Sequence, residues 1–99
     1  MDKEKEYTTL GEYKLYERAV EKWGVNEQLW MVEEELSELQ LAVCHLRRGK
    51  ATLADVMGEI ADAGIMIGQL GVILKINTHE LSAIRNKKLR RLEERLDKI

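Results

Sequence analysis

Residues 53–74 read LADVMGEIADAGIMIGQLGVIL, the longest apolar segment of the chain to be interrupted by only a few charged residues. It is apolar on nearly every side, so we expect one long helix that is central or lies at an oligomer interface. Thr52 and Asp55 are spaced as a capping box at its start. Small residues gather on one side of it: Ala54, Ala61, Gly64, Gly68 and Gly71. Because a glycine costs about 1 kcal/mol relative to alanine inside a helix, this clustering favours close approach by another helix.

Two helices are predicted before this stretch. Gly24 and Asn26 separate a first helix, near residues 10–23, from a second helix over residues 27–48. The second helix has apolar residues three and four apart, which is typical of a helix packed along one face. Gly49 follows its last turn and favours a helix end there.

One helix is predicted after the central stretch, which we expect to end near Ile76. Asn77 can adopt a left-handed conformation at that end, and Thr78 can cap a last helix that runs almost to Ile99. Four helices joined by short loops predict an all-α fold, an antiparallel four-helix bundle over residues 1–99 as a single domain. We expect homo-oligomerisation to complete the bundle.

Length and composition exclude several classes of protein. The chain has 99 residues, 44% hydrophobic and 34% charged, with a formal net charge of −2, so it holds one small domain and is not broadly basic like many nucleic-acid binders. The longest apolar run, residues 63–74, is shorter than the about 20 residues that span a bilayer. A lone Cys44 suits a reducing compartment, and residues 1–6 lack a signal peptide's apolar region. We therefore expect a cytoplasmic protein without membrane or nucleic-acid partners, in which the charged residues 1–8 are flexible.

The net charge is close to zero because acidic and basic residues are concentrated in different parts of the sequence. Residues 26–62 hold eight acidic and three basic side chains, whereas residues 78–99 hold seven basic and four acidic ones. An acidic centre and a basic last helix together suit the binding of a metal ion and a polyphosphate.

Four carboxylates lie on helix faces that are not solvated. Glu35 and Glu38 flank the apolar stripe of the second helix, and Glu59 and Asp62 lie on one face of the third helix. Each pair is spaced i,i+3, so its two side chains point the same way. Unpaired burial would cost several kcal/mol per charge, about the effective penalty for an ion in a protein interior. Either Lys or Arg side chains from the first or last helix neutralise the cluster, or Mg²⁺ or Mn²⁺ does so, since both ions prefer oxygen ligands.

At these residues the sequence resembles a known family. Residues 34–39 (EELSEL), followed by residues 59–62 (EIAD), resemble the ExxE…ExxD pattern of the MazG-like all-α nucleoside triphosphate pyrophosphohydrolases. That superfamily includes dimeric dUTPases and phosphoribosyl-ATP pyrophosphohydrolases. The resemblance covers the second to fourth predicted helices, and the size is that of the short single-domain members found in phages and Gram-positive bacteria.

The resemblance implies a reaction in which a (d)NTP and water give a (d)NMP and pyrophosphate, as in nucleotide-pool housecleaning. It implies that four residues hold Mg²⁺: Glu35, Glu38, Glu59 and Asp62. Glu35 or Glu38 would also orient or deprotonate the attacking water. Relatives are dimers or dimers of dimers, so a homodimer or homotetramer is expected.

Substrate contacts are predicted from the helix faces next to the carboxylates. Gln28 and Met31 precede Glu35 on the same flank and are expected to line a nucleotide pocket. On the basic last helix, Lys88 and Arg91 are expected to contact phosphates, as cationic residues in this region do in similar enzymes. A solvated, salt-bridged helix face is the alternative for those two residues.

Other functions fit the residues less well. A di-iron bundle needs Glu-x-x-His pairs, but Ala42 precedes His45 and Ile76 precedes His79 at that spacing. A helix-turn-helix protein would leave the inward carboxylates unexplained, because acidic groups near DNA are unfavourable. The serious alternative is a catalytically inactive MazG-like helical module that acts in interaction or regulation.

Overall fold

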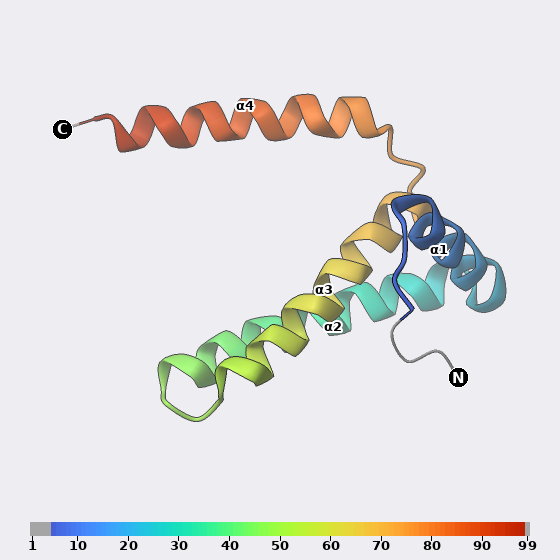
Figure 1. Cartoon of the computed structure of the whole chain (residues 1–99), viewed down its shortest axis with the longest axis horizontal. Coiled ribbons are helices and arrows are strands. Elements are labelled where there is room, and N and C mark those ends of the chain that lie inside the picture. The colour runs from blue at the N-terminus through green and yellow to red at the C-terminus, as the bar shows by residue number, and fades with distance from the viewer. Residues whose placement is uncertain (1–4, 99) are drawn as a thin grey trace.

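A computed structural model describes residues 5–98, and it is entirely helical within that range apart from short connections. This confirms the all-α class (Figure 1). The four helices are α1 (Thr9–Trp23), α2 (Val25–Arg47), α3 (Leu53–Ile73) and α4 (Thr78–Leu96). Residues 5–8 precede α1 without regular secondary structure, and the rest of the segment expected to be flexible, residues 1–4, lies outside the described residues.

The start of α3 has the predicted cap. The Asp55 N–H donates to the Thr52 hydroxyl at 3.1 Å, and the Thr52 N–H donates to the Asp55 carboxylate at 2.8 Å. This reciprocal pair is a capping box, which satisfies two of the backbone donors that a helix start leaves free. Gly49, with φ 71°, lies in the left-handed region just after α2, as expected for the residue that ends that helix.

The end of α3 differs from the prediction. The helix ends at Ile73, and Lys75, not Asn77, takes the left-handed conformation, with φ 54°. Asn77 is instead the N-cap of α4, because its side-chain oxygen accepts the N–H groups of His79 and Glu80 at 2.9 and 3.1 Å. A single Asn side chain thereby satisfies two free donors, so Thr78 becomes the first residue of the helix and not its cap.

The packed part of the chain consists of three helices. After the short connection at residues 48–52, α3 returns along α2, and α1 lies across the other end of this pair (Figure 1). Val32 of α2 and Met66 and Ile73 of α3 form the buried core, with partly buried apolar neighbours around them: Val20, Leu29, Met31 and Leu70. This arrangement fixes the faces of α2 and α3 that carry the acidic residues.

The last helix, α4, packs on none of the other three helices and extends away from them (Figure 1). All its described residues are exposed, and the radius of gyration is 16.6 Å, whereas a compact chain of this length has about 13 Å. The described residues of one chain therefore do not close into the expected four-helix bundle. The apolar side chains of α4 are therefore left exposed, because no other described helix contacts them.

One described helix has the dimensions of a membrane span. Judged by length and composition alone, α3 is long and apolar enough to cross a bilayer, a property shared by core helices of soluble proteins. The prediction from sequence considered only the apolar run of residues 63–74, which Gln69 interrupts, and that run is shorter than a membrane span. Location and membrane contact stay predictions.

Candidate metal centre

Three of the four predicted carboxylates come together between α2 and α3. Glu35 and Glu38 lie one turn apart on α2, and Glu59 projects from the neighbouring part of α3. One carboxylate oxygen from each of the three lies within 4.8 Å of the others. Because the i,i+3 spacing puts Glu35 and Glu38 on one side of their helix, the packing of α3 against α2 is enough to assemble this group.

Two oxygens in the cluster are buried without a hydrogen-bond partner. They are Oε2 of Glu35 and Oε2 of Glu59, and both residues are half-buried, whereas Glu38 is exposed. A buried acceptor that lacks a partner costs about 1–3 kcal/mol, and more when it is charged. A cation or a hydrogen-bond donor placed between these oxygens would therefore stabilise the cluster.

The surroundings of the cluster disfavour the simultaneous ionisation of its three carboxyl groups. Desolvation raises the pKa of Glu35 above its ordinary value, and repulsion from neighbouring carboxylates adds to the effect, that of Glu38 most. The pKa of Glu59 is raised by the same causes: desolvation first, then Glu38 and Asp62. No basic side chain of the described residues offsets these shifts. The first alternative, neutralisation by Lys or Arg, is thus not realised within the described part of one chain.

Asp62, the fourth predicted ligand, lies at the margin of the group. It is exposed, and it does not share the mutual closeness of the other three. Its charge still raises the pKa values of Glu35 and Glu59, so it lies near enough to interact with both.

The residues present fit a hard divalent cation. All the donors are carboxylate oxygens, the ligands that Mg²⁺ and Mn²⁺ prefer, and the two unpartnered buried oxygens are groups that a cation would satisfy. Glu35, Glu38 and Glu59 would hold it, with Asp62 as the nearest further ligand. Mg²⁺ usually keeps several waters or phosphate oxygens in its shell, and the exposed side at Glu38 leaves room for them.

Gln28 does not lie in an open nucleotide pocket. Its side chain is completely buried between α2 and α3, where its Oε1 accepts a hydrogen bond from Nε2 of Gln69. Its own Nε2 donates to Sδ of Met31 at 3.4 Å, and Met31 packs on the core. Both residues were predicted to line the site, but in this arrangement they hold the two helices together. A position on the flank of the apolar stripe fits either role, so the sequence alone could not separate them.

Lys88 and Arg91 are not brought to the carboxylates within the chain. Both are exposed on α4, which contacts none of the helices that carry the acidic residues. Their predicted contact with phosphates therefore requires either a movement of α4 or a second copy of the chain.

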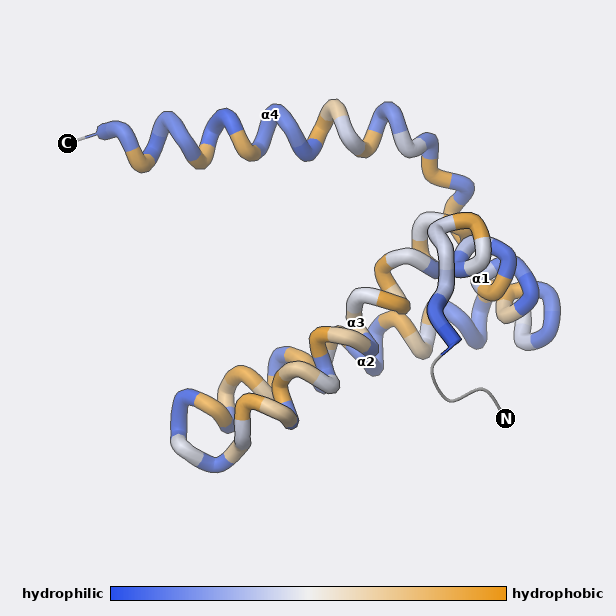
Figure 2. Tube along the Cα trace, viewed as in Figure 1, coloured by the Kyte–Doolittle hydropathy of each residue, from blue (hydrophilic) through white to orange (hydrophobic). Residues whose placement is uncertain are grey.

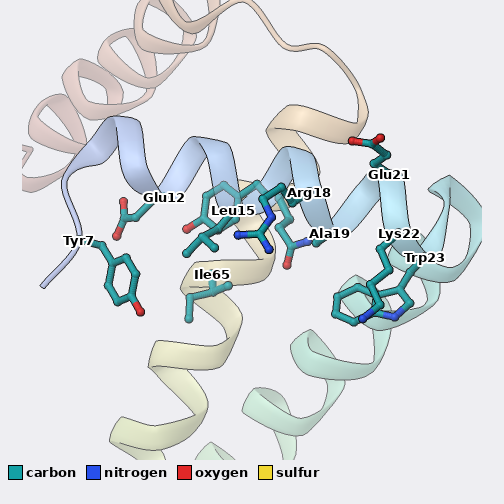
Figure 3. Close-up of a pocket in the computed structure, with 11 residues that line it drawn as sticks. Tyr7, Glu12, Leu15, Arg18, Ala19, Glu21, Lys22, Trp23 and Ile65 are labelled. Atoms are coloured by element: carbon teal, nitrogen blue, oxygen red, sulfur yellow. The ribbon is translucent and has the colours of Figure 1, made fainter. Parts of the chain in front are cut away.

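A groove that the sequence did not reveal runs between α1 and α3 (Figure 3). Its volume is about 910 Å³, and it is lined by aromatic, apolar and charged side chains, among them Tyr16, Arg18, Trp23, Ile65 and Gln69. None of the four carboxylates lines it. Tyr16, which lines the groove, also lies against Gly68 of α3, where an added Cβ would come within 2.8 Å of the Tyr16 ring. The clustering of glycines in the third predicted helix was the only signal of this close approach.

Comparison with known proteins assigns neither a family nor a function: no family model, no curated protein and no solved structure matches this chain.

Proposed function

We propose that the protein is a Mg²⁺-dependent nucleoside triphosphate pyrophosphohydrolase that converts a (d)NTP and water into a (d)NMP and pyrophosphate. One observation carries this proposal. Two i,i+3 acidic pairs on adjacent helices place carboxylate oxygens of Glu35, Glu38 and Glu59 within 4.8 Å of one another, and two oxygens in the group are buried without a partner. The order and spacing of these residues match the ExxE…ExxD pattern of MazG-like enzymes.

In the proposed reaction, water attacks the α-phosphorus of the triphosphate and the bond to the bridging oxygen breaks. Pyrophosphate leaves with the bond's electrons, and the proton of the water passes to a carboxylate of the cluster, Glu35 or Glu38. When bound, Mg²⁺ would supply positive charge that offsets the charge on the phosphates.

We further propose that the active form is a homo-oligomer, a dimer or a tetramer. The chain exposes 8821 Å², whereas a compact monomer of its mass exposes about 5,800 Å². A second copy would give α4 a packing partner and a route by which Lys88 and Arg91 could reach a bound triphosphate.

The test is a panel of (d)NTPs assayed with Mg²⁺ for both pyrophosphate and monophosphate. Glu38→Gln and Asp62→Asn are expected to lower the rate by about 10²-fold or more, a loss typical of removing one electrostatic stabiliser. Glu33→Gln is the matched control, because Glu33 is an exposed glutamate on the same helix outside the cluster.

The absence of release from every triphosphate by a folded protein would decide against the enzyme and favour the inactive interaction module. An equal loss of rate in the Glu33→Gln control would decide against the acidic cluster as the active site. Binding of Mn²⁺ followed by electron paramagnetic resonance gives a second readout, in which Glu59→Gln weakens binding and Glu33→Gln does not.

A further inference from the structure

The groove between α1 and α3 has the size and the lining of a small-molecule site. Its volume of about 910 Å³ lies within the range of about 300–1,000 Å³ that ligand pockets occupy. Leu15 and Ala19 of α1 and Ile65 of α3 form the aliphatic part of its lining. Gln69 also lines it, and this nearly buried side chain is held in place by its hydrogen bond to Gln28. The groove is therefore a preformed feature of the packed helices.

Three aromatic side chains line the groove: Tyr7, Tyr16 and Trp23. Tyr7 and Trp23 lie at its two ends (Figure 3), and each is about half exposed. Burial raises the pKa of the Tyr16 hydroxyl, and the charge of Glu12 adds to the rise. Partly exposed rings of this kind offer flat apolar surface on which a further ring can stack. The lining therefore suits a ligand with an aromatic body.

Arg18 places a positive charge between the two aromatic ends. Its side chain is directed to the side of α1 on which Ile65 lies (Figure 3). No ion pair joins Arg18 to another residue of the described range 5–98. A guanidinium can bind a carboxylate through two parallel hydrogen bonds. Arg18 is therefore available to hold the anionic group of a ligand that lies in the groove.

The other charged residues of the lining leave the middle of the groove to Arg18. The ammonium of Lys22 lies 5.5 Å from the centroid of the Trp23 ring, at one end. Glu12 lies at the opposite end, beside Tyr7, and Glu21 is directed away from the groove (Figure 3). A ligand in the middle therefore meets a positive charge and no carboxylate.

We propose that the groove binds a small aromatic anion, with its ring on the apolar lining between Tyr7 and Trp23 and its carboxylate held by Arg18. The two requirements, a flat apolar body and one negative charge, follow from the two kinds of side chain that line the groove. None of the four carboxylates of the candidate metal centre lines it. Binding there does not depend on the proposed activity, so a negative pyrophosphate assay would leave it standing.

The unpacked helix α4 is a poorer occupant of the groove. Figure 2 shows hydrophilic residues along most of α4, and the helix carries six basic and three acidic side chains. Placing this positively charged helix against Arg18 and Lys22 would bring like charges together, which is unfavourable in an interface. A groove filled by α4 would also have no room for a small ligand, so a binding experiment distinguishes the two occupants.

Calorimetric titration of the full chain in EDTA tests the proposal with two matched probes. 2-Naphthoate is an aromatic carboxylate, and 2-naphthalenemethanol has the same ring system without the charge. We expect saturable binding of 2-naphthoate that is about tenfold or more tighter than that of 2-naphthalenemethanol, because the neutral compound cannot make charge-assisted hydrogen bonds. The absence of saturable 2-naphthoate binding, or equal affinity for the two compounds, overturns the proposal.

The two tryptophans of the chain report where the probe binds. Trp23 lines the groove, whereas Trp30 lies exposed on α2 and does not line it. In nuclear magnetic resonance spectra, with the two indole N–H signals assigned from a Trp30→Phe variant, 2-naphthoate is expected to shift the Trp23 signal and not the Trp30 signal. Equal shifts of both signals would indicate adsorption to exposed apolar surface and would overturn the proposal.

Single substitutions on α1 test the role of Arg18. Arg18→Gln is expected to weaken 2-naphthoate binding by about tenfold or more and to leave 2-naphthalenemethanol binding unchanged. Lys14→Gln is the matched control, because it removes the same charge from an exposed residue of α1 that does not line the groove. Equal weakening by both variants would mean that only the net charge of the helix matters, and it would overturn the proposal.

A further variant separates the groove from the acidic cluster. Glu38→Gln, which alters the candidate metal centre, is expected to leave 2-naphthoate affinity unchanged, because Glu38 does not line the groove. A change in affinity comparable to that of Arg18→Gln would place the probe at the acidic cluster and would overturn the assignment of a separate site.

Discussion

At the scale of single residues, a buried hydrogen bond between two glutamine side chains joins α2 to α3. Gln28 is fully buried and Gln69 nearly so, and Gln69 donates to Gln28 across the two helices. Gln28 is fully enclosed, so its amide oxygen has no access to solvent if Gln69 is removed. The pair therefore fixes how the two helices that carry the carboxylates are set against each other.

We expect Gln28→Leu to lower the free energy of unfolding by about 1–3 kcal/mol, because it leaves the Gln69 amide buried without its partner. The double variant Gln28→Leu/Gln69→Leu should be less destabilised than the sum of the two single variants. Urea unfolding of all four proteins gives this coupling as a double-mutant cycle. Simple additivity would show that the two amides do not depend on each other.

The acidic cluster makes the metal-free protein sensitive to pH. The pKa of Glu35 is raised above its ordinary 4.5 in the folded state, so between those two values the folded state binds more protons than the unfolded state. The free energy of unfolding therefore falls as pH rises through that interval. We expect Glu35→Gln, measured in EDTA, to match wild type below about pH 4 and to become the more stable protein as pH rises. Saturating Mg²⁺ should reduce or reverse this advantage.

Asp55 supplies a control of opposite sign for the pH experiment. Its hydrogen bonds with Thr52 lower its pKa below the ordinary 3.8, so its contribution is present above that value and is lost as pH falls through the lowered one. Asp55→Asn should therefore lose most stability relative to wild type at neutral pH. A Glu35→Gln difference that stays constant with pH would contradict the account of the cluster.

At the scale of helices, the packing of α1 on α3 depends on one glycine. A Cβ built at Gly68 would lie 2.8 Å from the ring of Tyr16. Helix propensity alone would make Gly68→Ala stabilising by about 1 kcal/mol, but overpacking typically costs about 1–3 kcal/mol. We expect a net loss of stability in urea unfolding.

Two further variants separate the clash from other effects of Gly68→Ala. Gly58→Ala, on the same helix in open surroundings, should stabilise by up to about 1 kcal/mol. Adding Tyr16→Leu to Gly68→Ala should recover part of the loss, because it removes the ring that the new methyl group meets. If Gly68→Ala instead raised the free energy of unfolding, the Tyr16 ring or α1 would have to move aside without loss of stability.

The helices show how far the sequence could be read. Local signals were sufficient where the partner is local: the Thr52–Asp55 capping box and the helix end at Gly49 were both predicted and are present. The i,i+3 spacing of the acidic pairs predicted one site with Glu35, Glu38, Glu59 and Asp62, of which the first three lie within 4.8 Å of one another and Asp62 does not. The role of Gln28 could not be predicted, since its partner Gln69 lies 41 residues away. The position of α4 could not be predicted either. Apolar residues along one side of a helix indicate that this side is buried, but they do not show which surface it packs against.

At the scale of the whole molecule, the chain is more open than its composition suggests. Its core consists of few residues around Val32, Met66 and Ile73, while α4 and the outer side of α3 present apolar side chains to solvent. In proteins most of a helix's stability comes from the packing of an amphipathic face, and α4 contacts none of the other three helices. The stability of α4 should therefore depend on assembly, even though its N-cap at Asn77 is well formed.

Hydrogen exchange can measure this dependence helix by helix. At concentrations where sedimentation shows an oligomer, we expect the amides of α4 to be protected. On dilution below the dissociation constant, those amides should exchange first, while the amides of α2 and α3 around Val32 and Met66 keep more of their protection. Strong protection of α4 in a chain that sediments as a monomer would contradict this expectation, since it would require α4 to fold back onto its own chain.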